Sequence, residues 1–451
     1  MRKLALLFVG ILVAAGAMAQ EDQREVEVLS LDDCINTALD RNIQLKRAKN
    51  NELIARANNF QAIMNFFPTV TASINYDFFF GTFFDTNAAR QISATTNSSN
   101  PNLSTNLTIF NGFANHYAKR QTQKSVEAAA LNVEGQKLSV ESNILGSYLQ
   151  VIIDQENIKI SQQRVELLEK QLERAKKRES VGVGGMEDVY NFQSQLATEK
   201  LNLTIAQNTL RSDKLALIQA MVLDVTEKEY QIAPYELDSE ELLLEIESFD
   251  ALLSEILYKM PSVQSARANL ESSKYQMKAA SASRLPTISL FGRIGSNFSS
   301  NGALNPETGE FEDNASFEEQ LGYNEFEYLN FSLSIPIFQN YRRSTDYQVA
   351  KINYANAEIG VSEAVNDITN LTQQVYLDLV SAQETYISAK ENLESLTQSF
   401  EFMKKRYETG NTDFYTYLES LNNKNRAEIQ LVNAKYGIVF RKKILDLYRS
   451  M

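Results

Sequence analysis

Residues 379–407, LVSAQETYISAKENLESLTQSFEFMKKRY, contain the pattern that decides the fold. Apolar and small side chains recur there at alternating steps of three and four residues: Leu379, Ala382, Tyr386, Ala389, Leu393, Leu396, Phe400, Met403 and Tyr407. A strict 3.5-residue repeat predicts a left-handed coiled coil rather than a lone amphipathic helix. Glu408-Thr409-Gly410 then ends the helix, and a second helical pattern follows.

The same unit occurs 228 residues earlier in the chain. Its seam comprises Val151, Asp154, Ile158, Ser161, Val165, Leu168, Leu172 and Ala175. Ser180-Val181-Gly182 follows that seam, as Glu408-Thr409-Gly410 follows the other. The sequence therefore predicts two long helical hairpins, each with a glycine at its tip.

Composition supports long helices and excludes some functions. The 451 residues include no Trp, 17 Gly and 7 Pro, and the formal net charge is −13. Tracts rich in Ala, Leu, Gln, Glu and Lys are typical of long helices. A basic surface for nucleic acid is not expected on so acidic a chain, so nucleic acid is not among the expected partners.

The N-terminus is typical of a secretory signal peptide over residues 1–19. Arg2 and Lys3 are the charged start, residues 4–13 are the apolar run, and residues 17–19 give an A-x-A cleavage site. A transmembrane anchor is the alternative, but the apolar run is short and ends in small residues. No other stretch approaches 18 apolar residues, so no membrane-spanning helix is expected. Export therefore indicates a periplasmic, secreted or outer-membrane protein.

Period-two alternation predicts four strands, in two pairs. The first pair lies at about 68–80 and 103–111, separated by a polar loop at about 81–102. The second pair lies at about 286–298 and 328–338, and the loop at 299–327 between them is acidic. Each strand is apolar on one face and small-polar on the other.

The elements predict an internal duplication. Helices are expected from Ser30 to Phe67 and from Phe249 to Leu285, each ended by a following proline. We therefore divide the mature chain into a first repeat, residues 20–248 with its hairpin tip at 181–185 and an irregular linker at 224–248, and a second repeat, residues 249–451 with its tip at 409–413.

Alternating strands of about ten residues match transmembrane β-strands, although a soluble sheet with one apolar face gives the same pattern. The signal peptide and the missing apolar helix favour the membrane interpretation. Four strands cannot close a barrel, and open edges in lipid leave backbone groups unpaired, so the barrel must be shared between chains. Two chains would give eight strands and a filled interior, whereas three would give 12 and an open lumen.

Several segments, in order and duplicated, resemble the TolC-like outer-membrane efflux proteins. The opening helix LDDCINTALDRNIQL at 31–45 is similar to that of the family. Two helix-to-strand junctions, at 67–69 and 285–287, are also similar to those of the family. So are two strand-to-helix exits, at 107–112 and 335–340, and two hairpin tips, at 178–189 and 406–418. The resemblance covers nearly the whole mature chain.

This resemblance implies a mainly α fold with a small β part, assembled as a homotrimer. A 12-strand transmembrane β-barrel in outer-membrane lipid would continue into a long antiparallel coiled-coil α-barrel in the periplasm. The implied function is the exit duct of a tripartite efflux or type I secretion system. A periplasmic adaptor would join the duct to an inner-membrane transporter of the RND or ABC type.

No residues suggest an enzyme or a cofactor site. His116 is the only histidine and Cys34 the only cysteine, which leaves little material for a catalytic triad, a metal site or an intramolecular disulfide. There is no P-loop, so energy must come from a partner. His116 is interpreted as an ordinary surface residue.

A tunnel across the periplasm must be closed at rest, most simply by polar contacts at the tips that a partner can break. In the resembled family, an aspartate after the first tip pairs with a tyrosine before the second, and Asp188 and Tyr407 match those positions. The alternative is a solvated aspartate and a tyrosine that ends the seam. A second family contact uses an arginine where this chain has Thr412, with Glu187 at the partner position.

The resemblance also implies a constriction and a docking site. Glu419 matches one acidic pore residue of the family, whereas Thr416 replaces the other; an exposed helical glutamate is the alternative. Val181-Gly182-Val183 resembles the tip that meets the adaptor, and Gly410 belongs to its second copy. Each glycine has the simpler interpretation of a helix end.

Two other functions compete with the duct. A structural envelope-spanning coiled coil with no transport role would share the heptads, but it has no use for paired alternating strands. A periplasmic binding module is disfavoured because no pocket-forming domain is evident in the sequence.

Overall fold

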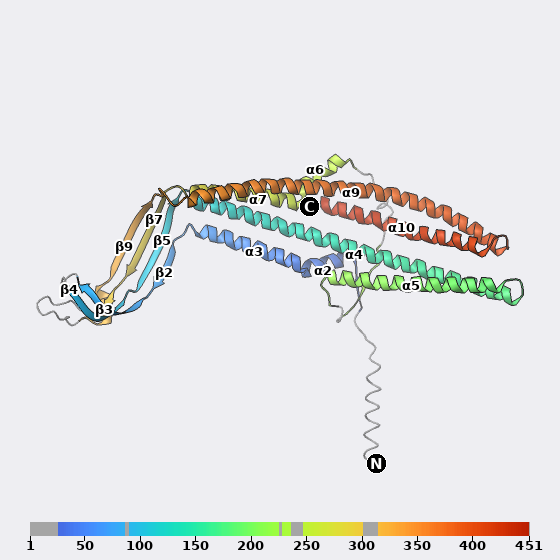
Figure 1. The fold of residues 1–451 in the computed structure, drawn as a ribbon, viewed down its shortest axis with the longest axis horizontal. Coiled ribbons are helices and arrows are strands. Elements are labelled where there is room, and N and C mark those ends of the chain that lie inside the picture. The colour runs from blue at the N-terminus through green and yellow to red at the C-terminus, as the bar shows by residue number, and fades with distance from the viewer. Residues whose placement is uncertain (1–25, 86–89, 225–227, 236–246, 301–313, 451) are drawn as a thin grey trace, which may run out of the picture. The chain divides into compact units, whose positions relative to one another are not determined.

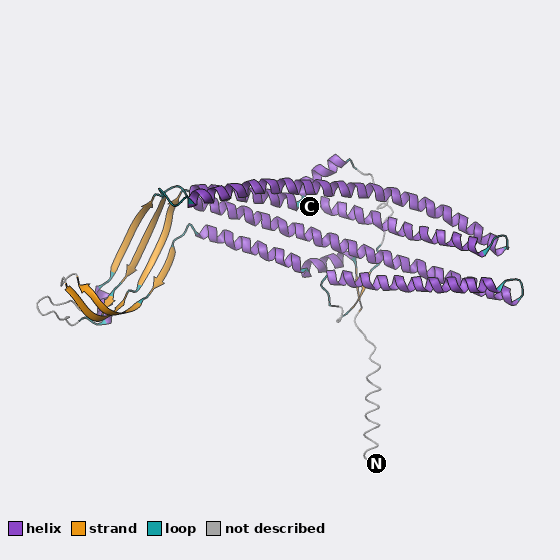
Figure 2. Ribbon diagram, viewed as in Figure 1, coloured by secondary structure: helices purple, strands orange, loops and turns teal. Residues whose placement is uncertain are grey.

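The computed structural model describes residues 26–85, 90–224, 228–235, 247–300 and 314–450 (Figure 1). The chain divides into two compact units. The helical unit comprises Met1–Asn50, Leu131–Gln264 and Ala364–Met451, and the strand unit comprises Asn51–Ala130 and Ser265–Glu363. The fold is mainly α with a small β part, as the sequence predicts (Figure 2).

The helices confirm the internal duplication. Helices α2 (Leu31–Arg41) and α3 (Ile43–Met64) have the same lengths, 11 and 22 residues, as α6 (Phe249–Lys259) and α7 (Pro261–Ala282). Helices α4 (Ala114–Ser180) and α9 (Arg342–Glu408) each have 67 residues. They are followed by α5 (Met186–Ala220) and α10 (Phe414–Arg449). None of the helices in the described ranges combines the length and apolarity needed to cross a bilayer.

Along the 379–407 stretch, every seam residue is buried or half-buried, whereas most of the residues between them are exposed. The 3.5-residue pattern therefore selects the packed side of α9. In the earlier copy, Asp154 puts a carboxyl group into the seam, with only 6% of its surface exposed. Burial raises the pKa of Asp154 to about 6, and a hydrogen bond with Asp213 of α5 adds to the rise.

The expectation of unbroken helices from Ser30 to Phe67 and from Phe249 to Leu285 is wrong. Ser30 does cap α2, but the chain turns out of the helix at Asn42, whose side chain then accepts hydrogen bonds from the first amides of α3. In the second half the break is at Met260, because Pro261 disfavours helical geometry in the residue before it. Both halves thus bend at equivalent positions.

The four alternating strands form one antiparallel sheet in the strand unit, in the order β2-β5-β7-β9. Their bounds are Thr69–Ser73, Asn102–Asn111, Thr287–Gly295 and Phe326–Ser334. The register places apolar side chains together on one face: Val70, Ala72, Leu103, Leu107, Ile288, Leu290, Ile294, Leu329, Phe331 and Leu333. This apolar face is open, with Val70 65% and Phe331 69% exposed. The edge strands β2 and β9 each have one partner strand within the described chain.

The strand predicted at 68–80 is interrupted after Ser73, and the loop predicted at 81–102 is largely strand. β3 (Tyr76–Asp85) pairs with β4 (Arg90–Ser99), and β8 (Phe298–Ser299) adds to β4 as a third strand. Residues 90–99 lack a clear apolar alternation in sequence, and it is their backbone pairing with β3 that identifies them as a strand. The predicted 299–327 loop contains a short helix, α8 (Phe317–Tyr323), capped by Ser316.

In the helical unit, β1 (Val26–Leu29) pairs in parallel with β6 (Glu229–Ile232), and β6 lies in the 224–248 linker that the sequence predicts to be irregular. The strands cover a core that includes Cys34, whose pKa burial raises to about 12. Tyr148 of α4 fastens this sheet by donating a hydrogen bond to the carbonyl of Ala233, at 2.8 Å.

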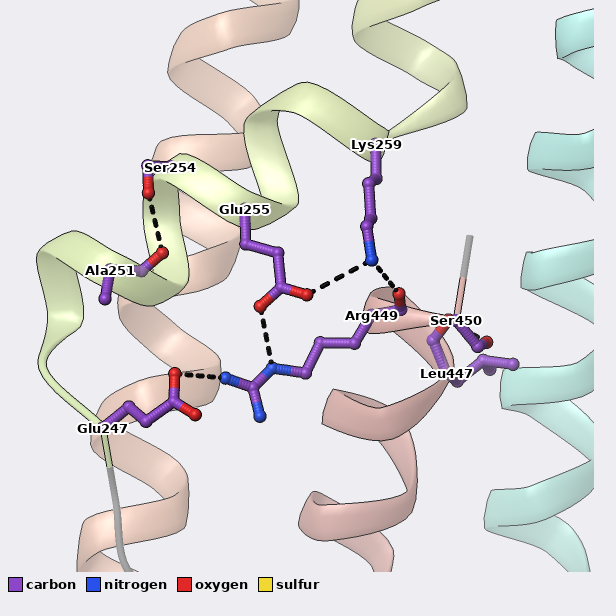
Figure 3. Close-up of polar contacts among 8 residues, drawn as sticks. All are labelled: Glu247, Ala251, Ser254, Glu255, Lys259, Leu447, Arg449 and Ser450. Atoms are coloured by element: carbon purple, nitrogen blue, oxygen red, sulfur yellow. Dashed lines mark hydrogen bonds and ion pairs between the residues drawn. The ribbon is translucent and has the colours of Figure 1, made fainter.

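The end of α10 is tied to α6 by an ion network (Figure 3). The guanidinium of Arg449 pairs with Glu247 at 2.6 Å and with Glu255 at 3.2 Å. Lys259 pairs with Glu255 and donates to the carbonyl of Arg449 at 2.6 Å. The contacts satisfy a helix-terminal carbonyl and fix the first helix of the second half against the last.

Candidate functional site at the hairpin tips

Both hairpins end in the same capping motif. In each, a glycine in the left-handed region, φ +75° at Gly182 and +76° at Gly410, reverses the chain after the long helix. Two amide-to-carbonyl bonds close each turn in the Schellman pattern. These bonds are Gly182 to Glu179 and Val183 to Arg178, both 2.9 Å, and Gly410 to Tyr407 and Asn411 to Arg406, at 3.0 and 2.8 Å.

The two tips differ in the surface that they present. Val181 and Val183 are 71% and 70% exposed, so the first tip is apolar. The second tip presents Asn411, whose side chain bonds to Thr409. A Cβ added to Gly182 or Gly410 would meet no atom within 4 Å, so both glycines lie at open surfaces.

Behind the tips, aromatic side chains from both hairpins form a cluster, which we call the tip cluster. Its members are Phe192 of α5, Phe400 and Tyr407 of α9, and Phe414 and Tyr417 of α10. Tyr407 stacks on Tyr417 with ring centroids 5.0 Å apart, and Phe192 meets Phe414 edge-on at 4.7 Å. Tyr417 is fully buried, and its hydroxyl has no hydrogen-bond partner within the described ranges.

The structure brings the predicted pair Asp188 and Tyr407 together across the two hairpins. The two side chains are close enough to interact, and a hydrogen bond from the Tyr407 hydroxyl to the Asp188 carboxylate is the smallest of the contributions to the pKa of Tyr407. Burial raises the pKa of Tyr407 to about 12, and the negative charge of Asp188 adds to the rise, against the nearby Arg178. The pair lines a cavity of about 170 Å³, which Arg174 also lines. Tyr407 therefore stays protonated, and remains a donor, at any physiological pH.

Two arginines of α4 make further contacts with the second hairpin that sequence reasoning missed. Arg174 pairs with Glu408 at 3.0 Å, directly beside Tyr407 in sequence. Farther from the tip, Arg164 donates to the backbone carbonyl of Asn425 in α10. Burial lowers the pKa of Arg164, and the charges of Glu199 and Glu428 oppose that shift. Arg174 and Glu408 lie 234 residues apart, and neither position carries a sequence signal for the contact.

The remaining predicted residues are not brought into contacts of the same kind. Glu187 is exposed and Thr412 is half-buried, and no hydrogen bond joins them in the described part of the chain. Asp413 caps α10 by accepting a hydrogen bond from the Thr416 backbone amide at 3.0 Å, and the Thr416 hydroxyl donates to the same carboxylate at 2.7 Å. Glu419 is exposed on the same helix.

The site is built from noncovalent contacts, which can be broken and formed again. Over the described residues, no group of three or more His, Cys, Asp or Glu is arranged to hold a metal ion. His116 lies in the first turn of α4 in the strand unit, against the ring of Tyr117. What the tips offer is a hydrogen bond and an ion pair between two hairpins over an aromatic cluster.

A sequence model of the outer membrane efflux protein family matches residues 34–221 and 252–441. The chain belongs to this family. The two matched segments coincide with the two halves of the fold. The family comprises outer-membrane channel proteins rather than enzymes.

Relatives in this family are distant in sequence. Outer membrane protein TolC of Salmonella enteritidis is 23% identical over 273 residues, which cover 59% of this chain and 51% of that protein. TolC of Vibrio cholerae is 24% identical, over 62% of this chain and 60% of that protein. The chain thus spans about half the length of the curated relatives it matches.

Solved structures extend the likeness in fold to most of the chain. The Campylobacter jejuni CmeC outer membrane channel superposes with a TM-score of 0.76 at 19% identity, covering 93% of this chain and 85% of that one. CusC gives a TM-score of 0.77 at 15% identity, with 93% and 91% covered. At these identities the comparison establishes the fold of the family and not the cargo.

Proposed function

We propose that this protein is one subunit of a trimeric, passive exit duct in the outer membrane that extends into the periplasm. The observation that carries the proposal is the β2-β5-β7-β9 sheet, which has an exposed apolar face and two edge strands that pair with no further strand among the described residues. An apolar sheet face suits lipid, and a polar opposite face suits a water-filled lumen. Membership of the outer membrane efflux protein family supports the same conclusion.

The sheet also argues for the number of copies. In lipid, an unpaired strand edge leaves backbone groups without hydrogen bonds, so β2 of one copy must pair with β9 of another. Two copies would make an eight-stranded barrel, which side chains fill. Three copies make a 12-stranded barrel with an open lumen, which a duct requires.

We propose the tips as the gate. At rest, the Asp188–Tyr407 hydrogen bond would hold the second hairpin against the first, and the tip cluster would position both groups. A periplasmic adaptor would dock on the apolar tip at Val181, Gly182 and Val183, with Gly410 marking the second docking tip, and would break the contact. An inner-membrane transporter of the RND or ABC type would supply the energy.

Two further pairs have smaller parts in this proposal. Glu419 would face the pore near its narrow end, where three copies would attract cations and repel anions. Thr416 is uncharged and its hydroxyl is bonded to Asp413, the N-cap of α10, so Glu419 alone would supply the charge. Glu187 and Thr412 would be neighbours at the gate without the ion pair that an arginine would provide.

Membrane fractionation tests the proposal. Cells expressing the protein should yield it in the outer-membrane fraction as a heat-modifiable trimer, and the purified trimer should conduct ions in a planar bilayer once Tyr407→Phe removes the proposed gate contact. Recovery as a soluble monomer would overturn the duct and would favour an envelope-spanning coiled coil without transport.

A further inference from the structure

One side chain on the polar face of the β2-β5-β7-β9 sheet carries a charge. The cross-strand register groups the following residues on that face: Thr69, Thr71, Ser73, Asn102, Ser104, Asn106, Thr108, Asn111, Thr287, Ser289, Phe291, Arg293, Gly295, Phe326, Tyr328, Asn330, Ser332 and Ser334. Arg293 is the only Lys, Arg, Asp or Glu among them. Glu327, the other charged residue of these four strands, pairs with Ile294 and so lies on the apolar face.

Aromatic neighbours hold Arg293 on this face. Its guanidinium lies over the ring of Phe326, 5.4 Å from the ring centroid, which is a cation–π contact. Tyr328, directly opposite on β9, meets Phe291 edge-on at 6.2 Å beside it. Neither aromatic ring carries a charge that would compensate the guanidinium. In the described ranges no carboxylate pairs with the guanidinium, and its Nε has no hydrogen-bond partner.

We infer that Arg293 forms a cationic ring in the strand-lined part of the lumen and raises the permeability of anions relative to cations there, against the opposite preference of the proposed Glu419 ring near the tips. The inference rests on the proposed function, because three copies of the sheet must close with their polar faces inward. An arginine is charged at every physiological pH. Rings of Arg or Lys select for anions in pores, and lumen-facing substitutions in β-barrels tune selectivity. The ring is notable on a chain whose net charge is −13.

The size of the effect follows from Coulomb's law. Three unit charges about 8 Å from the pore axis, screened by about 0.1 M salt, change the local concentration of a monovalent ion by about threefold. Removing them should therefore lower the ratio of anion to cation permeability by at least about threefold. Higher salt should shrink the difference, because the Debye length falls.

The test is the reversal potential of purified trimers in a planar bilayer across a potassium chloride gradient. Arg293→Gln removes the charge, Arg293→Lys keeps it, and Ser104→Glu places a carboxylate directly opposite it on β5. We expect Arg293→Gln and Ser104→Glu to shift the reversal potential towards cation selectivity, and Arg293→Lys to match the wild type. Trimer mobility on gels confirms assembly of each variant.

The outcomes separate this inference from the function on which it rests. Conducting Arg293→Gln and Ser104→Glu trimers with the wild-type reversal potential would overturn the cationic ring and leave the duct intact. Loss of selectivity in Arg293→Lys as well would also overturn it, because the charge would not be the cause. Absence of any conductance even from trimers that carry Tyr407→Phe, in which the proposed gate contact is lost, would overturn the duct, and the ring with it.

Discussion

Replacing Tyr407 with Phe isolates the hydroxyl that is proposed to hold the gate. The phenyl ring can keep its stacking on Tyr417, at 5.0 Å, and its edge contact with Phe192, at 6.1 Å. What is lost is the hydrogen bond to the Asp188 carboxylate, worth about 1.5 kcal/mol at a half-exposed position. That loss favours the open state about tenfold in each subunit, and about a thousandfold if three subunits open together.

Two measurements detect this change. Single-channel recordings of Tyr407→Phe should show a larger open fraction than the wild type, and cells should become sensitive to antibiotics too large for ordinary porins. Asp188→Ala should behave alike, because it removes the acceptor of the same bond. The matched control is Tyr190→Phe, which removes a hydroxyl from a 63% exposed tyrosine near the first tip. Wild-type conductance and permeability in both gate variants, at normal protein levels, would refute the reasoning.

Three further predictions concern the helical unit. Arg174→Glu should leave two facing carboxylates and open the duct partially, by up to about tenfold in open probability, and the double variant with Glu408→Arg should restore closure at low salt. No restoration would show that the pair does not act directly. Asp154→Asn should stabilise the trimer at pH 7.5 more than at pH 4 in thermal unfolding. The raised pKa means that the wild-type contribution to stability is complete below about pH 3.8 and is lost as the pH rises through about 6. An equal gain at both pH values would contradict this. Gly182→Asp should abolish efflux in cells while trimers remain in the membrane, because it charges the apolar tip; Gly182→Ala is the matched control, with the same backbone strain and no added charge. Normal efflux in Gly182→Asp would argue against docking there.

Periodicity predicted the parts of the fold that depend on one repeating contact. The seam from Leu379 to Tyr407 and the alternation in β2, β5, β7 and β9 are visible in sequence because each buries or exposes a regular set of side chains. Elements that lack a regular set of apolar side chains were not predicted. β4 reads Arg-Gln-Ile-Ser-Ala-Thr-Thr-Asn-Ser-Ser and is a strand through its backbone pairing with β3. The break at Asn42 depends on a single side chain that caps the next helix.

The residues of the candidate site also divide into those that the sequence predicted and those that it did not. The family resemblance named Asp188 and Tyr407 because their positions relative to the tip glycines are fixed by the hairpins. It could not name Arg174 and Glu408, since their contact depends on how two separate hairpins pack. Thr416 shows the reverse problem, because it stands where the family has an acidic pore residue, but its hydroxyl and amide are bonded to Asp413, the N-cap of α10. The alternation in sequence places Arg293 on the polar side of its own strand. Only the register of all four strands shows that it is the one charged residue on the polar face of the sheet.

The equal length of α4 and α9, 67 residues each, limits how the hairpins can be altered. One inserted residue would rotate everything beyond it by about 100° and shift it by about 1.5 Å along the axis. Such an insertion in only one of the two helices would turn Asp188 away from Tyr407 and shift one tip along the helix axis relative to the other. Seven residues complete two turns of the coiled coil and return each side chain to its original direction. Any lengthening of the hairpins should therefore add whole heptads to all four of their helices, α4, α5, α9 and α10.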